Sequence, residues 1–140
     1  MSEQNKAAFR RMLHEVIAGG NLELIDELVM PDFVNYVYRS SGEIMKIVGS
    51  EAFRAAQAQM QTIFSNVTME EFQMIAEGDH LVAHYRMRGV HIGAFLGVAA
   101  TGKTIHMDGM TIVRFVDGKF AERRGVIDTI PLYKQLGIAP

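Results

Sequence analysis

The spacing of apolar residues changes once along this chain, from a helical period to strict alternation, at about residue 67. Before that point apolar side chains recur every three or four positions, which is typical of amphipathic helices. After it they alternate with polar ones, and Gly78-Asp79 and Asp117-Gly118 interrupt the alternation as two-residue hairpin turns. Helices followed by antiparallel strands predict an α+β fold, in which a curved sheet packs against helices on one side.

The same pattern places the individual elements. We predict helices over 5–18, 22–29, 51–65 and 129–136, and strands over 32–39, 67–77, 80–91, 103–116 and 119–127. Gly19-Gly20 ends the first helix, Pro31 ends the second, and Ser50 is the predicted N-cap of the third. Because no repeat, low-complexity tract or charge block divides the chain, residues 1–140 are predicted to form a single domain.

Composition excludes several classes of protein and site. The absence of Cys excludes a disulfide framework, a thiolate nucleophile and a cysteine-based zinc site. A formal net charge of −2 provides no positive field for phosphate backbones, so we expect no nucleic-acid partner. Apolar runs are too short to span a bilayer, and the polar segment 1–7 does not resemble a signal peptide. We therefore expect a cytoplasmic protein with no membrane partner.

The hairpin turns predict which side chains share a face of the sheet. A two-residue turn at Asp117-Gly118 pairs Phe115 with Phe120, and the same register carries on to Met107 opposite Asp128. One face then carries Phe72, Met74, Tyr85, Met87, Met107, Thr111, Val113, Phe115, Phe120 and Val126, with Glu122, Arg124 and Asp128 as its polar members. The other face carries His84, Arg86, Arg88, His106, Asp108, Arg114 and Arg123. We expect the helices to cover the first face. A bulge in either hairpin would invert this assignment for the strand that contains it.

Asp128 is the member of the apolar face that could carry chemistry. A carboxyl group at the end of an apolar face is desolvated, which suits it to exchange protons near neutral pH. Asp128 also directly precedes a predicted helix with Pro131 in its first turn, where an Asp is a good N-cap. Thr129 could serve as the cap instead, which would free Asp128. The residues alone leave catalysis and capping both open.

Further polar residues are candidates for the wall of a pocket. His91 could orient a substrate carbonyl or share a proton with Asp128, or it could simply bond loop backbone. Arg124 could hold an anionic or enolate oxygen, or pair with Glu122. Tyr85, Tyr36 and Asn35 could be polar pocket walls or ordinary strand residues. The 10 Met residues fit either a pocket lining or ordinary packing, because Met fills irregular apolar space.

Two apparent motifs lack the secondary structure that their function requires. Residues 97–104 match the phosphate-loop pattern GxxxxGKT, but a strand-like apolar segment follows where the mechanism needs a helix. His80 and His84 have a metal-ligand spacing for a helix, yet on a strand they lie roughly 13 Å apart. We therefore expect neither a nucleotide site nor a metal site.

Residues 78–137 carry an ordered series of motifs. The series comprises GxHxGxFxG over residues 89–97, with His91 and Phe95, then ATGK over 100–103, DGK over 117–119, Asp128, and QLG over 135–137. In this series the chain resembles the SnoaL-like polyketide cyclase family, and residues 20–35 resemble it as well.

The resemblance implies a nuclear transport factor two-like fold, a cone-shaped and usually dimeric α+β barrel. It also implies ring closure of an aromatic polyketide ester by intramolecular aldol condensation, without a metal or an organic cofactor. The family's acid/base aspartate falls on Asp128. We expect Asp128 to remove or return a proton next to a carbonyl group, and His91 or Arg124 to stabilise the enolate oxygen. The ligand would be a small apolar or aromatic molecule, and the expected pocket residues are Arg124, Tyr85, Met87, Met107, Phe95, Tyr36 and Asn35. The alternative is a ligand-binding or dimerisation module of the same fold without catalysis.

Overall fold

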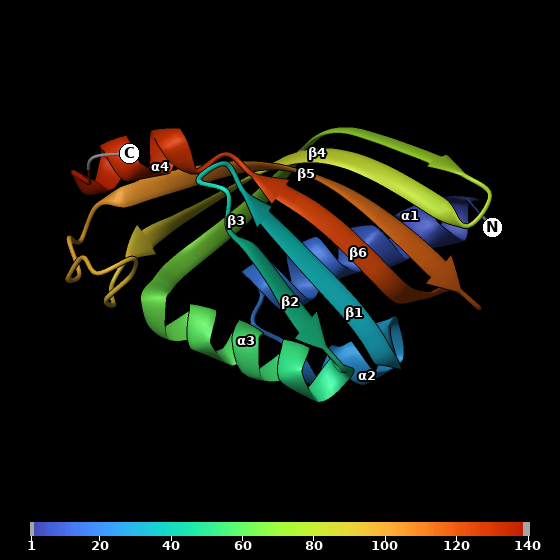
Figure 1. The fold of residues 1–140 in the computed structure, drawn as a ribbon. Helices are drawn as coiled ribbons and strands as arrows, with labels where there is room; N and C mark the ends of the chain where they lie inside the picture. Colours follow the sequence, from blue (N-terminus) through green and yellow to red (C-terminus); the bar gives the residue numbers. More distant parts are fainter. Residues whose placement is uncertain (1, 139–140) are drawn as a thin grey trace.

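The helices of the computed structural model, which describes residues 2–138, follow the predicted order (Figure 1). The N-terminal segment is α1 (Ser2–Arg11), continued by a π-helical stretch η1 (Met12–Ala18). A 3₁₀ turn η2 (Leu22–Leu24) leads into the short helix α2 (Ile25–Leu28). Helix α3 spans Ser50–Ile63 and α4 spans Thr129–Leu136. Ser50 is the first residue of α3, and Gly49 holds the N-cap position that we predicted for Ser50. No helix within residues 2–138 is long and apolar enough to cross a membrane.

The strands form one six-stranded mixed sheet in the order β2-β1-β6-β5-β4-β3. Their bounds are β1 Val29–Arg39, β2 Ile44–Val48, β3 Phe64–Glu77, β4 His80–His91, β5 Thr104–Val116 and β6 Lys119–Ile127. β1 runs parallel to β6, and all other neighbours are antiparallel. β1 continues through Pro31 because its pairing with β6 is irregular between Val29 and Val34, where a missing N–H interrupts no ladder bond.

Strand β2 was not predicted. It forms the sheet edge, and the side chains of Ile44 and Val48 are 63% and 58% exposed. An edge strand with little burial shows no alternation of apolar and polar residues, so its sequence carries no strand period.

The main core lies between the helices and the concave face of the sheet. Figure 1 shows α1 and α3 on the same side of the curved sheet, with α4 at the end where the β4–β5 connection lies. The buried ring of Phe120 contacts the rings of Phe9, Phe33 and Phe115, with centroids 5.0 to 6.2 Å apart. This arrangement confirms the predicted α+β fold with helices covering the apolar face.

A bulge next to the Asp117-Gly118 turn changes the predicted register of β5 and β6. Phe115 pairs with Phe120 as predicted, but Arg114 then pairs with Glu122, which leaves Ala121 without a partner. From that point every residue of β6 faces the side opposite to the predicted one. Arg123 lies on the concave face, whereas the predicted concave placements of Glu122, Arg124, Val126 and Asp128 are wrong.

A second bulge lies in the β3–β4 hairpin. Gln73 pairs with His84 and Glu71 with Tyr85, so Phe72 is the extra residue. Phe72 was predicted on the buried face but is 45% exposed, and Met69 instead turns inward opposite Met87. The predicted placement is confirmed for the buried side chains of Tyr85, Met87, Met107, Thr111, Val113, Phe115 and Phe120.

The start of helix α4 is capped by Ser40 and not by Asp128, and its end is bonded to β5 through Gln135. The Asp128 side chain makes no capping hydrogen bond, and the first helical N–H, that of Thr129, donates to Oγ of Ser40 at 2.9 Å. The amide of Gln135 bonds both the N–H and the C=O of His106 on β5, at 2.8 and 3.0 Å. The cap of α4 therefore comes from the β1–β2 turn, which no local sequence signal indicates.

Candidate functional site

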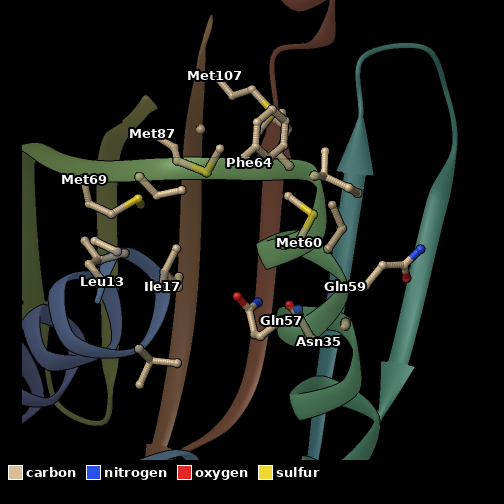
Figure 2. Close-up of a pocket in the computed structure, with 18 of the residues that line it drawn as sticks. Leu13, Ile17, Asn35, Gln57, Gln59, Met60, Phe64, Met69, Met87 and Met107 are labelled. Carbon is tan, nitrogen blue, oxygen red and sulfur yellow. The ribbon is translucent and has the colours of Figure 1, made fainter. Parts of the chain in front are cut away.

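A cavity of about 700 Å³ lies between the concave face of the sheet and the helices. Its wall is mostly apolar and comes from α1, η1, α3, the sheet strands and the loop after β4. Six of its members are the methionines Met12, Met45, Met60, Met69, Met87 and Met107. Figure 2 shows Met60, Met87 and Met107 close to Phe64, while Asn35 and Gln57 present amide groups from another side. Apolar walls with a few polar groups are typical of small-molecule sites.

Arg123 is the centre of the polar group in this cavity. Its Nη1 donates to Oδ1 of Asn35 at 2.9 Å, and its Nη2 donates to the hydroxyl of Tyr85 at 2.8 Å. Asn35 is 4% exposed and Tyr85 is 9% exposed, so both partners are fixed within the core. The cluster of Arg123, Tyr85 and Asn35 spans the sheet from β1 through β6 to β4, and we call it the arginine cluster.

Two glycines provide the space for this cluster. A Cβ atom at Gly125 would lie 2.5 Å from Nη2 of Arg123, and one at Gly109 would lie 2.8 Å from the hydroxyl of Tyr85. Gly109 pairs with Tyr85, and Gly125 pairs with Thr111, so both glycines lie in the middle of the sheet. A glycine inside a strand is typical of a close approach by another group, and here that group is a guanidinium or a phenol.

The other charged residues of the cavity wall form ion pairs, and the Asp108 side chain does so on the outer face of the sheet, where Arg86 is its cross-strand partner. Arg39 donates to Glu43 at 2.8 Å. Asp108 accepts from Nε and Nη2 of Arg86 at 2.6 and 2.8 Å, and these bonds hold the pKa of Asp108 below its ordinary range. Within residues 2–138 no carboxylate forms an ion pair with Arg123. Arg123 is thus a cavity cation with neutral partners only.

His91 is buried beside the cavity and does not line it. Its Nδ1 accepts the backbone N–H of Thr101 at 3.3 Å and lies 3.0 Å from Oγ1 of the same residue, which assigns the ring proton to Nε2. Nε2 has no hydrogen-bond partner among the described residues, and the side chain is 0% exposed. The ring contacts Phe64, which does line the cavity, with centroids 6.0 Å apart.

The structure divides the remaining predicted site residues into two groups. Asn35, Tyr85, Met87, Met107 and Phe95 lie on the cavity wall.

Arg124 and Tyr36 lie on the outer face, with the guanidinium 4.2 Å from the ring centroid, so their predicted pocket positions are wrong. The guanidinium of Arg124 also contacts Tyr38 and Glu122. Asp128 is exposed at the start of α4, although its chain neighbours Ile127 and Thr129 line the cavity.

Sequence reasoning missed Arg123, Gln57 and the two glycines. The bulge moved Arg123 from the predicted outer face to the cavity, and no single residue signals that bulge. Gly109 and Gly125 were the available clue, because glycines in strand interiors often mark a close approach. Within the described residues, no group of three or more His, Cys, Asp or Glu side chains has the arrangement of a metal site.

Comparison with known proteins identifies the family. The model of the SnoaL-like polyketide cyclase family matches residues 7–136. The chain belongs to the SnoaL-like polyketide cyclase family. It is 30% identical over 138 residues to the aklanonic acid methyl ester cyclase AcmA of Streptomyces galilaeus, a match covering 98% of this chain and 92% of AcmA. This confirms the resemblance found in the motifs of residues 78–137.

Solved structures share the fold of this chain. AclR from Streptomyces galilaeus, described as a hydroxylase, is 26% identical with a TM-score of 0.84, and the match covers 100% of both chains. A Catenulispora acidiphila protein with a ketosteroid isomerase-like fold is 16% identical with a TM-score of 0.75, covering 94% of this chain and 93% of its own. The second likeness concerns the fold alone and agrees with the expected cone-shaped sheet.

Proposed function

We propose that this member of the SnoaL-like polyketide cyclase family binds a small, mainly apolar carbonyl compound in its cavity and converts it by acid/base chemistry. The reaction would be an aldol ring closure or an isomerisation, carried out by side chains of the chain itself. The name of AcmA, a methyl ester cyclase, supports a ring closure. The arginine cluster is the observation that carries this proposal, because it places fixed hydrogen-bond donors inside an apolar cavity.

The cluster suits the charge that such a reaction develops. Removing a proton next to a carbonyl group moves negative charge onto the carbonyl oxygen. Donors already held in place stabilise that oxygen without reorganisation, and they act more strongly where water is excluded. The O–H of Tyr85 would bind this enolate oxygen next to the positive charge of Arg123, while Met87, Met107 and Phe95 would hold the apolar frame.

Two residues are the proposed proton carriers. The resemblance assigns proton transfer to Asp128, whose neighbours Ile127 and Thr129 line the cavity at the start of α4. His91 is the proposed partner, because its Nε2–H is buried next to Phe64 and has no acceptor among the described residues.

Binding without catalysis is the second candidate function, and one observation favours it. The charged residues of the cavity wall are Arg39, Asp108 and Arg123. Asp108 is held as an anion by Arg86, so among the described residues no carboxylate on the wall is free to take up a proton. On this reading the cavity would bind the same class of ligand and release it unchanged.

Proton exchange of 2-tetralone in D₂O separates the two functions. NMR would follow loss of the protons next to the carbonyl group, and protein resonances would report binding. We expect the wild-type chain to accelerate exchange at least about tenfold over buffer, as positioned acid/base groups do, and Asp128→Asn to lose that acceleration while still binding. Binding without acceleration would support the second function. Absence of binding by 2-tetralone would contradict both.

We also propose that the chain forms a homodimer through the outer face of the sheet. Val82, Met110, Ile112 and Val126 lie there, with exposed fractions of 39%, 56%, 48% and 52%. Val82 pairs with Ile112 and Met110 with Val126 across neighbouring strands, so these side chains form one apolar patch. Contiguous exposed apolar patches are typical of protein interfaces, and a second copy would bury the same patch on both sides.

Light scattering after size-exclusion chromatography tests the dimer. The wild-type chain is expected to elute as a dimer and Ile112→Lys as a monomer, because the charge would be buried unpaired at the interface. Ile92→Lys is the matched control, since Ile92 is 47% exposed but lies in the β4–β5 connection. A monomeric wild-type chain, or equal effects of the two substitutions, would contradict this interface.

A further inference from the structure

One positive charge on the cavity wall, that of Arg123, has no carboxylate partner among the described residues. Arg39 is paired with Glu43, and Asp108 is paired with Arg86 in two hydrogen bonds. Arg123 has only the neutral oxygens of Asn35 and Tyr85 as partners among the described residues. The side chain cannot lose its charge, because a guanidinium remains protonated in proteins. This half-buried cation in an apolar cavity therefore forms no ion pair with any carboxylate of residues 2–138.

The groups of the arginine cluster that remain free for a ligand are mainly hydrogen-bond donors. A guanidinium carries five N–H donors, and the bonds to Asn35 and Tyr85 occupy one on each of the two Nη atoms. The Tyr85 oxygen accepts from Arg123, which leaves its own O–H free to donate. Asn35 uses Oδ1 as the acceptor, which leaves its NH₂ group free as well. A set of planar N–H and O–H donors around one cation matches a carboxylate better than a neutral ester.

The cluster is held in place rather than left to move. Asn35 and Tyr85 are 4% and 9% exposed, and they hold the two Nη atoms of Arg123 from opposite sides. Gly125 lies directly beneath the guanidinium, since a Cβ atom there would lie 2.5 to 2.8 Å from its three terminal atoms. A donor group fixed in this way loses little conformational entropy when a ligand binds.

We infer that the ligand of this cavity carries a free carboxylate on its apolar frame, bound by the free N–H groups of Arg123 and the NH₂ group of Asn35, next to the carbonyl oxygen that the O–H of Tyr85 binds. The inference rests on the proposed function, in which the cavity holds a small apolar carbonyl compound, and it specifies the charge of that compound. The relative AcmA is named for a methyl ester, which is neutral at the corresponding group. This chain would therefore select the acid rather than its methyl ester.

Binding of a matched acid and ester tests the inference. The probes are 2-naphthoate and methyl 2-naphthoate, and isothermal titration calorimetry at pH 7 gives both dissociation constants. We expect the wild-type chain to bind the acid at least about tenfold more tightly than the ester, as a charge-assisted bidentate contact provides. Arg123→Met keeps the apolar stem and removes the charge. It is expected to abolish the preference, because it would weaken binding of the acid far more than binding of the ester.

Arg124→Met is the matched control, because it removes the same charge from the neighbouring residue on the outer face. It is expected to keep the preference for the acid. Arg123→Lys, which keeps the charge without the planar fork, is expected to retain part of it. Circular dichroism would check that each variant folds.

Three other outcomes of these titrations would count against the inference. Equal binding of acid and ester by the wild-type chain would overturn the carboxylate inference and leave the proposed apolar site standing. Loss of the preference in Arg124→Met as large as in Arg123→Met would also overturn it, since net charge would then explain the effect. Failure of both probes to bind would contradict the proposed function, and this inference with it.

Discussion

Gly125→Ala is expected to remove the preference for an anionic ligand while the fold remains stable. The new Cβ atom would lie 2.5 Å from Nη2, 2.7 Å from Cζ and 2.8 Å from Nη1 of Arg123. These atoms are the end of a flexible side chain, so the guanidinium would move away and the backbone would not. Arg123 would then lose its bonds to Asn35 and Tyr85, and the wild-type preference for 2-naphthoate over its ester, about tenfold, would disappear.

The stability of Gly125→Ala should change little, by about 1 kcal/mol or less, because alanine is no worse than glycine inside a strand. Calorimetric titration and thermal unfolding would measure the two effects separately. Gly93→Ala is the contrasting variant, since its Cβ atom would meet the backbone carbonyl of Thr62, which cannot move aside. We expect that variant to lose stability. A Gly125→Ala chain that still prefers the acid would show that Arg123 does not depend on the open space over Gly125.

Phe120→Ala is expected to cause the largest loss of stability, about 3–5 kcal/mol, as truncation of buried phenylalanines does. Phe120 is 1% exposed, and its ring contacts Phe9, Phe33 and Phe115. These partners come from α1, β1 and β5, so the ring joins the N-terminal helix to the sheet. Its removal would leave a void among aromatic rings that cannot easily move together.

Urea unfolding at one fixed protein concentration would measure this loss. Phe72→Ala is the control, because Phe72 lies at the β3 bulge and is 45% exposed. Its ring lies against the polar side chains of His84 and Arg86. Its truncation is expected to cost less than about 1 kcal/mol. Similar losses for the two variants would contradict the assignment of Phe120, and not Phe72, to the core.

The alternation of apolar and polar residues predicted most of the sheet. Strands β4 and β6 have the predicted bounds, and Asp117-Gly118 forms the predicted hairpin turn with both residues at positive φ. The turn favours this conformation locally, because Asp and Gly tolerate it better than most residues. Tyr85, Met87 and Met107 line the cavity as the face assignment predicted, since β4 and β5 pair in a regular register.

The site itself depended on two irregularities that the sequence does not indicate. Ala121 and Phe72 are ordinary strand residues, yet each is the extra residue of a bulge. Side chains alternate with a period of two, so one extra residue transfers the rest of a strand to the opposite face. Arg123 therefore entered the cavity and Arg124 left it, although two adjacent arginines give no local reason to prefer either.

The sequence by itself determined the α+β class, the hairpin turns, most element bounds and the family of this protein, because each rests on local periodicity or on an ordered series of motifs. Only the tertiary structure decided which arginine lines the cavity, that Ser40 rather than Asp128 caps α4, and that Gly125 leaves space for a guanidinium. These features depend on contacts between residues far apart in the chain, where packing of the whole core selects one register and local preferences differ too little to do so.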